Sequence, residues 1–158
     1  MNIHPAELVI AIQAVQCIGS LVLAFLMLYF YRIQQRPFLC HWALSAAAVA
    51  VYLIASAAAL ALVFAGPSWA WLGLALSMIS LCAAYLHISW LMIGTWEAIF
   101  NRSVQRKVEK ICIVAALGFG LLTASIAPFD PEHALLRNIL RFDLRYILTG
   151  IAFIIAAW

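Results

Sequence analysis

The sequence predicts an all-α polytopic membrane protein, a single bundle of about five transmembrane helices with its N-terminus outside the cytoplasm. Hydrophobic residues make up 68% of the 158 residues and charged residues only 9%, and the mean hydropathy is +1.08. A soluble domain carries about a quarter charged residues, because it needs a solvated surface. The apolar runs are long and continuous, unlike the short alternating segments of a membrane β-barrel.

The spans follow from the apolar runs, because a helix needs about 20 apolar residues to cross the bilayer core. The first four spans are expected at residues 8–31, 42–65, 69–96 and 111–127. The last apolar run covers only residues 146–158, so its helix must begin earlier, and we expect the fifth span at 140–158. No Lys or Arg anchors the end of that span, and we therefore expect the natural chain to continue past Trp158.

The basic residues in the connecting segments set the orientation. Six follow the first and third spans: Arg32, Arg36, Arg102, Arg106, Lys107 and Lys110. Three lie on the opposite side: Arg137, Arg141 and Arg145. The larger set is expected in the cytoplasm, which places the N-terminus outside. A multi-pass protein of the inner (plasma) membrane is the predicted location.

The second span is rich in alanine and serine. Small residues let helix backbones approach closely in lipid, where packing drives helix association. This helix is therefore expected at the centre of the bundle. The four cysteines do not have metal-ligand spacing; Cys40 is expected in the first basic loop and the other three inside apolar runs.

His87 is the most suggestive single residue. It lies ten residues before the expected cytoplasmic end of the third span, at a depth of about 15 Å. Polar groups at such depth are candidates for function, so His87 is expected either to line a ligand or sensing site or to bond to a Ser or Tyr of a neighbouring helix. A haem would need a second histidine at matching depth, which the chain does not offer, and no cofactor is expected.

Two further sets of charged residues are candidates for function. Glu97, at the end of the third span, is expected to pair with Arg102 or Arg106, with a proton-relay carboxylate as the alternative. Arg137, Arg141 and Arg145 recur at every fourth position and share one helix face. They are expected to meet lipid phosphates from an interfacial helix, or, with His133, to form a site for an anion or a carboxylate ligand.

Two segments resemble the input modules of bacterial signalling proteins. The first runs from Tyr29-Phe30-Tyr31-Arg32 through Arg36 to Phe38-Leu39 and His41-Trp42-Ala43-Leu44, and the second from Gly94-Thr95-Trp96-Glu97 to Asn101-Arg102. They are similar to helix exits and basic turns in multi-span sensor modules that precede GGDEF diguanylate cyclase domains or histidine kinase cores. The resemblance implies a module that binds a small or lipophilic signal and passes helix movement to a cytoplasmic output domain.

Three functions remain open at this stage. The first is the sensory or regulatory module, with membrane lipids, a small-molecule signal and a second copy of the chain as partners. The second is a small accessory subunit of a larger membrane complex. The third, and weakest, is a carrier or enzyme that uses His87 and Glu97 inside the bilayer. The chain has no nucleophile triad, glycine-rich phosphate loop or metal-ligand cluster, so no enzyme activity is expected, and no basic stripe points to nucleic acid.

Overall fold

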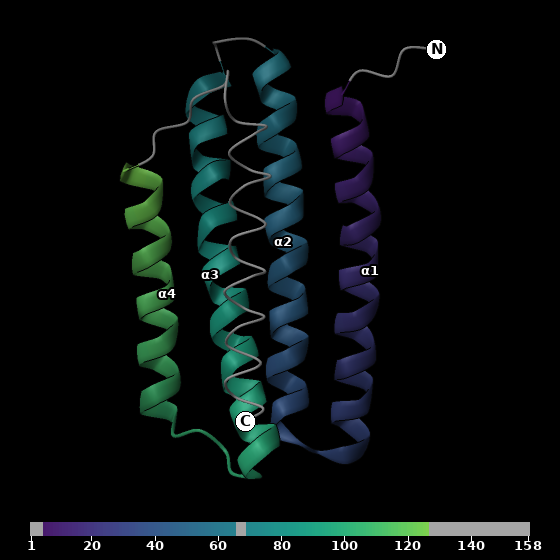
Figure 1. Cartoon of the computed structure of the whole chain (residues 1–158), viewed down its shortest axis with the longest axis vertical. Helices are drawn as coiled ribbons and strands as arrows, with labels where there is room; N and C mark the ends of the chain where they lie inside the picture. The colour runs from purple at the N-terminus through teal and green to yellow at the C-terminus, as the bar shows by residue number, and fades with distance from the viewer. Residues whose placement is uncertain (1–4, 66–68, 127–158) are drawn as a thin grey trace. The chain divides into compact units, whose positions relative to one another are not determined.

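The computed structural model describes residues 5–65 and 69–126. This part of the chain consists of four α-helices (Figure 1): α1 (Pro5–Gln34), α2 (Pro37–Ala65), α3 (Ala70–Phe100) and α4 (Arg106–Ile126). Neighbours in the sequence are neighbours in space, since α1 packs on α2, α2 on α3 and α3 on α4, each antiparallel to the one before. The predicted all-α class is confirmed.

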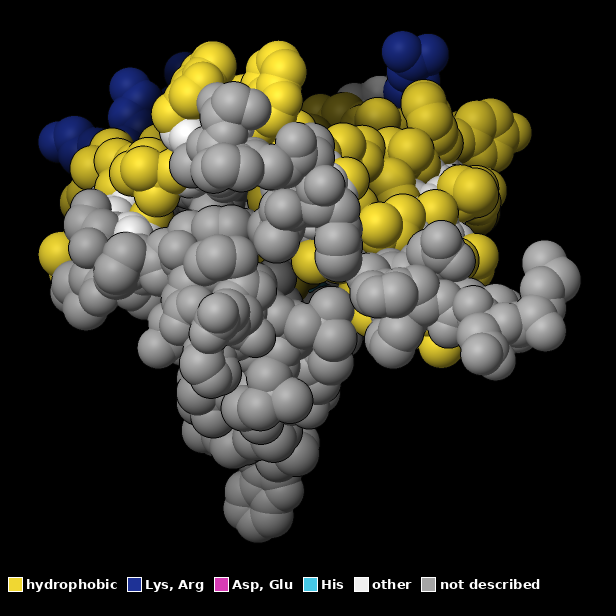
Figure 2. All heavy atoms as spheres, turned by 90° about the horizontal axis from the view of Figure 1, so that it is seen from above, with side chains coloured by type: hydrophobic (Ala, Val, Ile, Leu, Met, Phe, Trp, Pro, Cys, Tyr) yellow, Lys and Arg dark blue, Asp and Glu magenta, His cyan; other side chains and the backbone are white. Residues whose placement is uncertain are grey.

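Three of these helices are long and apolar enough to cross a membrane, over Leu8–Gln34, Pro37–Leu62 and Trp71–Phe100. Large apolar side chains cover the outside; in α1, Val15 and Phe25 are 71% and 70% exposed. Figure 2, viewed along the helices, shows that most of the described side chains in view are hydrophobic, with Lys and Arg at one edge. Water would penalise such a surface and lipid would not, so these helices indicate a membrane protein.

Helix α4 differs from the other three. Four of its first five residues are charged. The three described helices that are long and apolar enough to cross a membrane do not include it, so the fourth span at 111–127 stays a prediction. The predicted fifth span at 140–158 lies outside the described residues.

The predicted central place of the second span is confirmed, because α2 is the most buried of the three long helices. Most of its buried side chains are alanine or serine, and such small side chains permit close approach of the neighbouring backbones. The buried alanines of α2 are Ala43, Ala46, Ala48, Ala50, Ala55 and Ala59. Figure 1 shows α2 between α1 and α3.

The α1–α2 turn is shorter than the polar sequence around it. Gln35 adopts a left-handed conformation (φ 52°), and its N–H donates to the Tyr31 carbonyl at 2.8 Å. Pro37 then opens α2, where a missing N–H costs nothing. Cys40, expected in the loop, therefore lies in the helix. Hydropathy marks where apolar side chains stop, whereas Arg and Gln are good helix formers and let the backbone remain helical.

The α3–α4 connection is equally compact. Asn101 ends α3 in the left-handed conformation (φ 49°) that suits Asn at a helix end. Only residues 101–105 separate the two helices, although the sequence predicts a polar loop up to Lys110. This connection and the α1–α2 turn lie at the same end of the helices (Figure 1), and the candidate site is next to them.

Candidate functional site

The candidate site is built around the imidazole of His41, in the second turn of α2. Its Nδ1 lies 2.8 Å from Oε2 of Glu97, which comes from the last turn of α3. The exposed fractions of the two side chains are only 12% and 3%. A carboxylate this buried is stable only when its oxygens have partners, so the contact with His41 fixes α2 against α3 at this depth.

The second oxygen of Glu97 is also occupied. Oε1 accepts a hydrogen bond from the backbone N–H of Val104 at 2.9 Å, which ties the α3–α4 connection to the end of α3. The expectation that Glu97 pairs with Arg102 or Arg106 is therefore wrong. The left-handed turn at Asn101 folds the backbone back over the carboxylate, so a main-chain donor and His41 reach it in place of the arginines.

His41 has a second carboxylate near its other nitrogen. Nε2 lies 3.6 Å from Oε1 of Glu109, in the first turn of α4. This distance is too long for a hydrogen bond but short enough for electrostatic attraction when the imidazole is protonated. One side chain of α2 thus contacts charged groups of both α3 and α4.

The geometry of this cluster does not suit a metal ion. The two imidazole nitrogens point away from each other, and each faces a different carboxylate, so the three side chains cannot surround one ion. Within residues 5–65 and 69–126, no group of three His, Cys, Asp or Glu side chains could hold a metal. The arrangement can instead link three helices through one imidazole and two carboxylates.

His87 forms a second polar contact deeper between α2 and α3. Its Nδ1 lies 2.7 Å from Oγ of Ser45 and 3.2 Å from the Ser45 carbonyl oxygen, and the Ser45 hydroxyl donates to the His87 carbonyl at 3.2 Å. A carbonyl only accepts, so this set of contacts is satisfied when Nδ1 carries the proton. Because α3 continues to Phe100, His87 lies about 20 Å from the end of the helix.

The sequence expected His87 either to line a ligand site or to bond to a Ser or Tyr of a neighbouring helix. The structure places it on Ser45, with the imidazole turned into the α2–α3 interface. The other three candidate residues, His133, Arg137 and Arg141, lie outside the described residues. The grouping of these three residues with His87 therefore stays a prediction.

Sequence reasoning missed the role of His41, which it named only within a segment that resembles sensor modules and to which it assigned no partner. The signal was present: His41 and Glu97 lie near the ends of consecutive spans that meet at one side of the membrane. An imidazole and a carboxylate at the same depth on neighbouring helices are natural partners, because polar groups in a membrane pair with one another. Glu109, in the basic run before the fourth apolar segment, gave no such signal.

Comparison with protein-family models, with curated proteins and with solved structures gave no match.

Proposed function

We propose that this chain is a sensory or regulatory input module of a membrane signalling protein, which binds a small or lipophilic signal and relays helix movement to a cytoplasmic output. The observation that supports the proposal is the position of His41 between Glu97 of α3 and Glu109 of α4. A displacement of α2 against α3 changes both distances, and therefore acts on the α3–α4 connection and on α4.

The bond from Val104 extends this linkage into the loop. Helix pairs packed in this way shift by small translations or rotations between two arrangements, and a polar contact that prefers one arrangement biases the equilibrium. Ser45 lies about one turn from His41 in α2, and His87 about three turns from Glu97 in α3. Their contact provides a point where a signal in the bilayer would act on α2 and α3.

The proposal includes five spans, an external N-terminus and the inner membrane as location. The charges support this orientation, because six basic residues lie in or beside the α1–α2 and α3–α4 connections, at one end of the helices. Basic connecting segments remain on the cytoplasmic side during insertion. In this arrangement α4 continues as the fourth span and the residues at 140–158 form the fifth.

An accessory subunit of a larger membrane complex is the second candidate. The surface of α1 favours it, because α1 buries little of its length and exposes large side chains such as Val15, Ile18 and Phe25. Lipid covers such a face in a monomer, and a foreign subunit or a second copy would cover it in a complex.

Intact-mass analysis of the protein purified from its own membrane distinguishes the two candidates. The sensory module predicts a mass above 17.4 kDa, with peptides of a cytoplasmic domain after Trp158. A mass of 17.4 kDa together with stoichiometric foreign subunits would contradict the sensory module and support the accessory subunit. Peptide sequencing of the same sample identifies the output domain or the partner subunits.

A further inference from the structure

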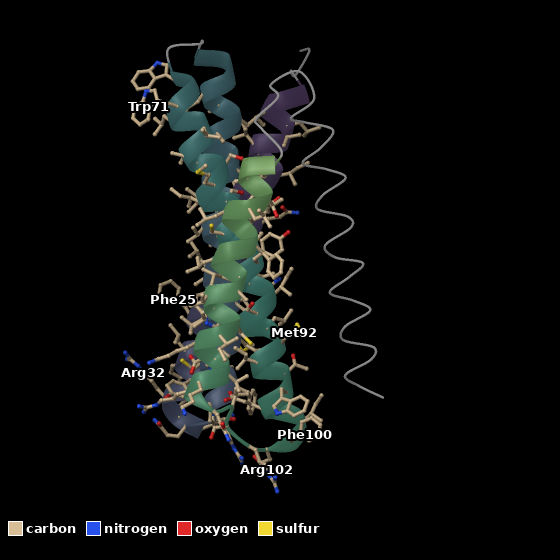
Figure 3. All side chains as sticks on the ribbon, turned by 90° about the vertical axis from the view of Figure 1, so that its left-hand side faces the viewer. Phe25, Arg32, Trp71, Met92, Phe100 and Arg102 are labelled. Carbon is tan, nitrogen blue, oxygen red and sulfur yellow. The ribbon has the colours of Figure 1, made fainter. Side chains whose placement is uncertain are left out.

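The two short connections lie together at one end of the described helices. The guanidinium of Arg36, in the α1–α2 turn, donates to Oδ1 of Asn101 in the α3–α4 connection at 3.0 Å. Figure 3 shows Arg32 and Arg102 at this same end. Two basic segments that are 65 residues apart in the sequence thus form one surface, which we call the basic end. Its six residues are Arg32, Arg36, Arg102, Arg106, Lys107 and Lys110.

The positive charge of the basic end is not neutralised by the residues around it. The acidic side chains of the described chain at this end are Glu97 and Glu109, and both face His41. No ion pair joins them to any of the six basic residues within the described part of the chain. The surface therefore presents an uncompensated positive field to whatever lies beside it.

The depth of the basic end matches the headgroup layer of a bilayer. Arg32 lies in the last turn of α1, Arg36 immediately precedes α2, and Arg102 follows the end of α3. Exposed aromatic side chains lie just inside this level, with Tyr29 61% exposed and Trp96 56% exposed. Aromatic rings of this kind mark the interface between hydrocarbon and headgroups, so the neighbouring guanidiniums are at phosphate height.

We propose that the basic end binds the headgroups of anionic phospholipids, with Arg32, Arg36 and Arg102 as the principal contacts. Guanidinium groups match the geometry of phosphate oxygens and bind them with two parallel hydrogen bonds. A zwitterionic headgroup carries its own cation, which the field of the basic end repels, whereas an anionic headgroup has net negative charge. The inference uses only the charges and depth of these side chains, and holds for a sensory module and for an accessory subunit alike.

The test is native mass spectrometry of the purified full chain in neutral detergent, titrated with phosphatidylglycerol or with phosphatidylcholine. The wild-type chain is expected to bind phosphatidylglycerol more tightly than phosphatidylcholine. The triple variant R32Q/R36Q/R102Q is expected to weaken phosphatidylglycerol binding on the order of 100-fold, since each Lys or Arg near an anionic membrane surface contributes about fivefold in affinity. Phosphatidylcholine binding should remain unchanged.

The matched control is R32K/R36K/R102K, which keeps the three charges and is expected to retain the preference. Circular dichroism of both variants verifies that the helices form. Should the Gln variant fail to fold, the wild-type chain is titrated in 1 M salt, where the screening length is about 3 Å. The proposal then requires that the preference for phosphatidylglycerol over phosphatidylcholine falls. Equal binding of the two lipids, or wild-type affinity in the folded Gln variant, would overturn the proposal. Displacement of phosphatidylglycerol by millimolar inorganic phosphate would show a site for a free anion and would also overturn it.

Discussion

Trp42 of α2 lies directly over Gly94 of α3, so close that a Cβ added at residue 94 would be 2.5 Å from Cδ1 of the indole. The same Cβ would lie 3.1 Å from the Phe38 carbonyl oxygen, and Phe38 packs edge-on against Trp42 with ring centroids 5.2 Å apart. The absence of a side chain at Gly94 thus lets α2 and α3 pack closely, about one turn from Glu97.

We predict that Gly94→Ala destabilises the chain. The indole is braced by Phe38 and cannot retreat freely, so the added methyl forces α2 and α3 apart, at a cost of about 1–3 kcal/mol in the free energy of unfolding. The measurement is unfolding in detergent followed by tryptophan fluorescence or circular dichroism. Gly73→Ala is the control on the same helix, because nothing lies within 4 Å of its added Cβ; it should be neutral or slightly stabilising. Equal stability of the two variants would contradict this packing.

Gly120 has the corresponding role between α4 and α3. A Cβ there would meet the backbone of Cys82, 2.7 Å from Cα and 2.9 Å from the amide nitrogen. Backbone atoms cannot rotate away, so Gly120→Ala should loosen α4 from α3. The expected result is faster amide hydrogen exchange in α4 with little change in α1.

Gly118 provides the control for this prediction, since it lies on the same helix with open space around its added Cβ. Gly118→Ala should leave the exchange of α4 unchanged or slower. Faster exchange in both variants would contradict the prediction, because α4 would then respond to any substitution in this segment and not to the close approach of Gly120 to Cys82.

The His41–Glu97 contact predicts a large effect on the α3–α4 connection. In His41→Ala the buried carboxylate keeps only the Val104 N–H as a partner, and breaking one side of a buried pair costs about 3 kcal/mol or more. Amide exchange over residues 101–105 should accelerate. Gln13→Ala is the control, because it removes the interhelical contact of Gln13 with Ser56 in α2 without touching this loop.

A double-mutant cycle separates the pair from general damage. Glu97→Gln removes the buried charge and keeps an oxygen for Val104, so the combination of His41→Ala with Glu97→Gln should be less destabilising than the sum of the two single changes. Strict additivity would show that His41 and Glu97 do not interact in the folded chain.

The contact between Ser45 and His87 predicts a smaller effect. Ser45→Ala removes the hydroxyl, but the Ser45 carbonyl still accepts from His87 Nδ1 at 3.2 Å. Hydrogen bonds between membrane helices contribute about 0.6 kcal/mol on average, and the expected loss in unfolding free energy is about 1 kcal/mol or less. A loss of unfolding free energy as large as that of His41→Ala would contradict the smaller contribution expected of the Ser45–His87 contact.

The sequence predicted the helices well because their signal is local. Continuous apolar runs identify three membrane-length helices, and the small residues of the second run predict its central place. The ends were less accurate, since polar residues such as Arg32 and Gln34 continue a helix after the apolar run stops. Helix termini depend on turn conformations at Gln35 and Asn101 that hydropathy does not detect.

The candidate site depends on information that is not local. His41 and Glu97 are 56 residues apart, and whether they meet depends on the rotation and register of α2 against α3. That register is set by packing details such as Trp42 over Gly94. The sequence shows how deep each of these residues lies in the membrane, but not which way its side chain faces. Depth alone therefore made an arginine the expected partner of Glu97.

The last prediction concerns orientation. In a variant whose four native cysteines are replaced by alanine, a single cysteine at Ser103 or Ser68 reports the side of the membrane. Ser103 is exposed in the α3–α4 connection, and Ser68 lies between α2 and α3 in the sequence. If the basic connections are cytoplasmic, a membrane-impermeant maleimide should label Ser68→Cys in intact cells and should label Ser103→Cys only after permeabilisation. The reverse pattern would place the N-terminus inside and the basic end on the external face, and would contradict a relay from this end to a cytoplasmic output.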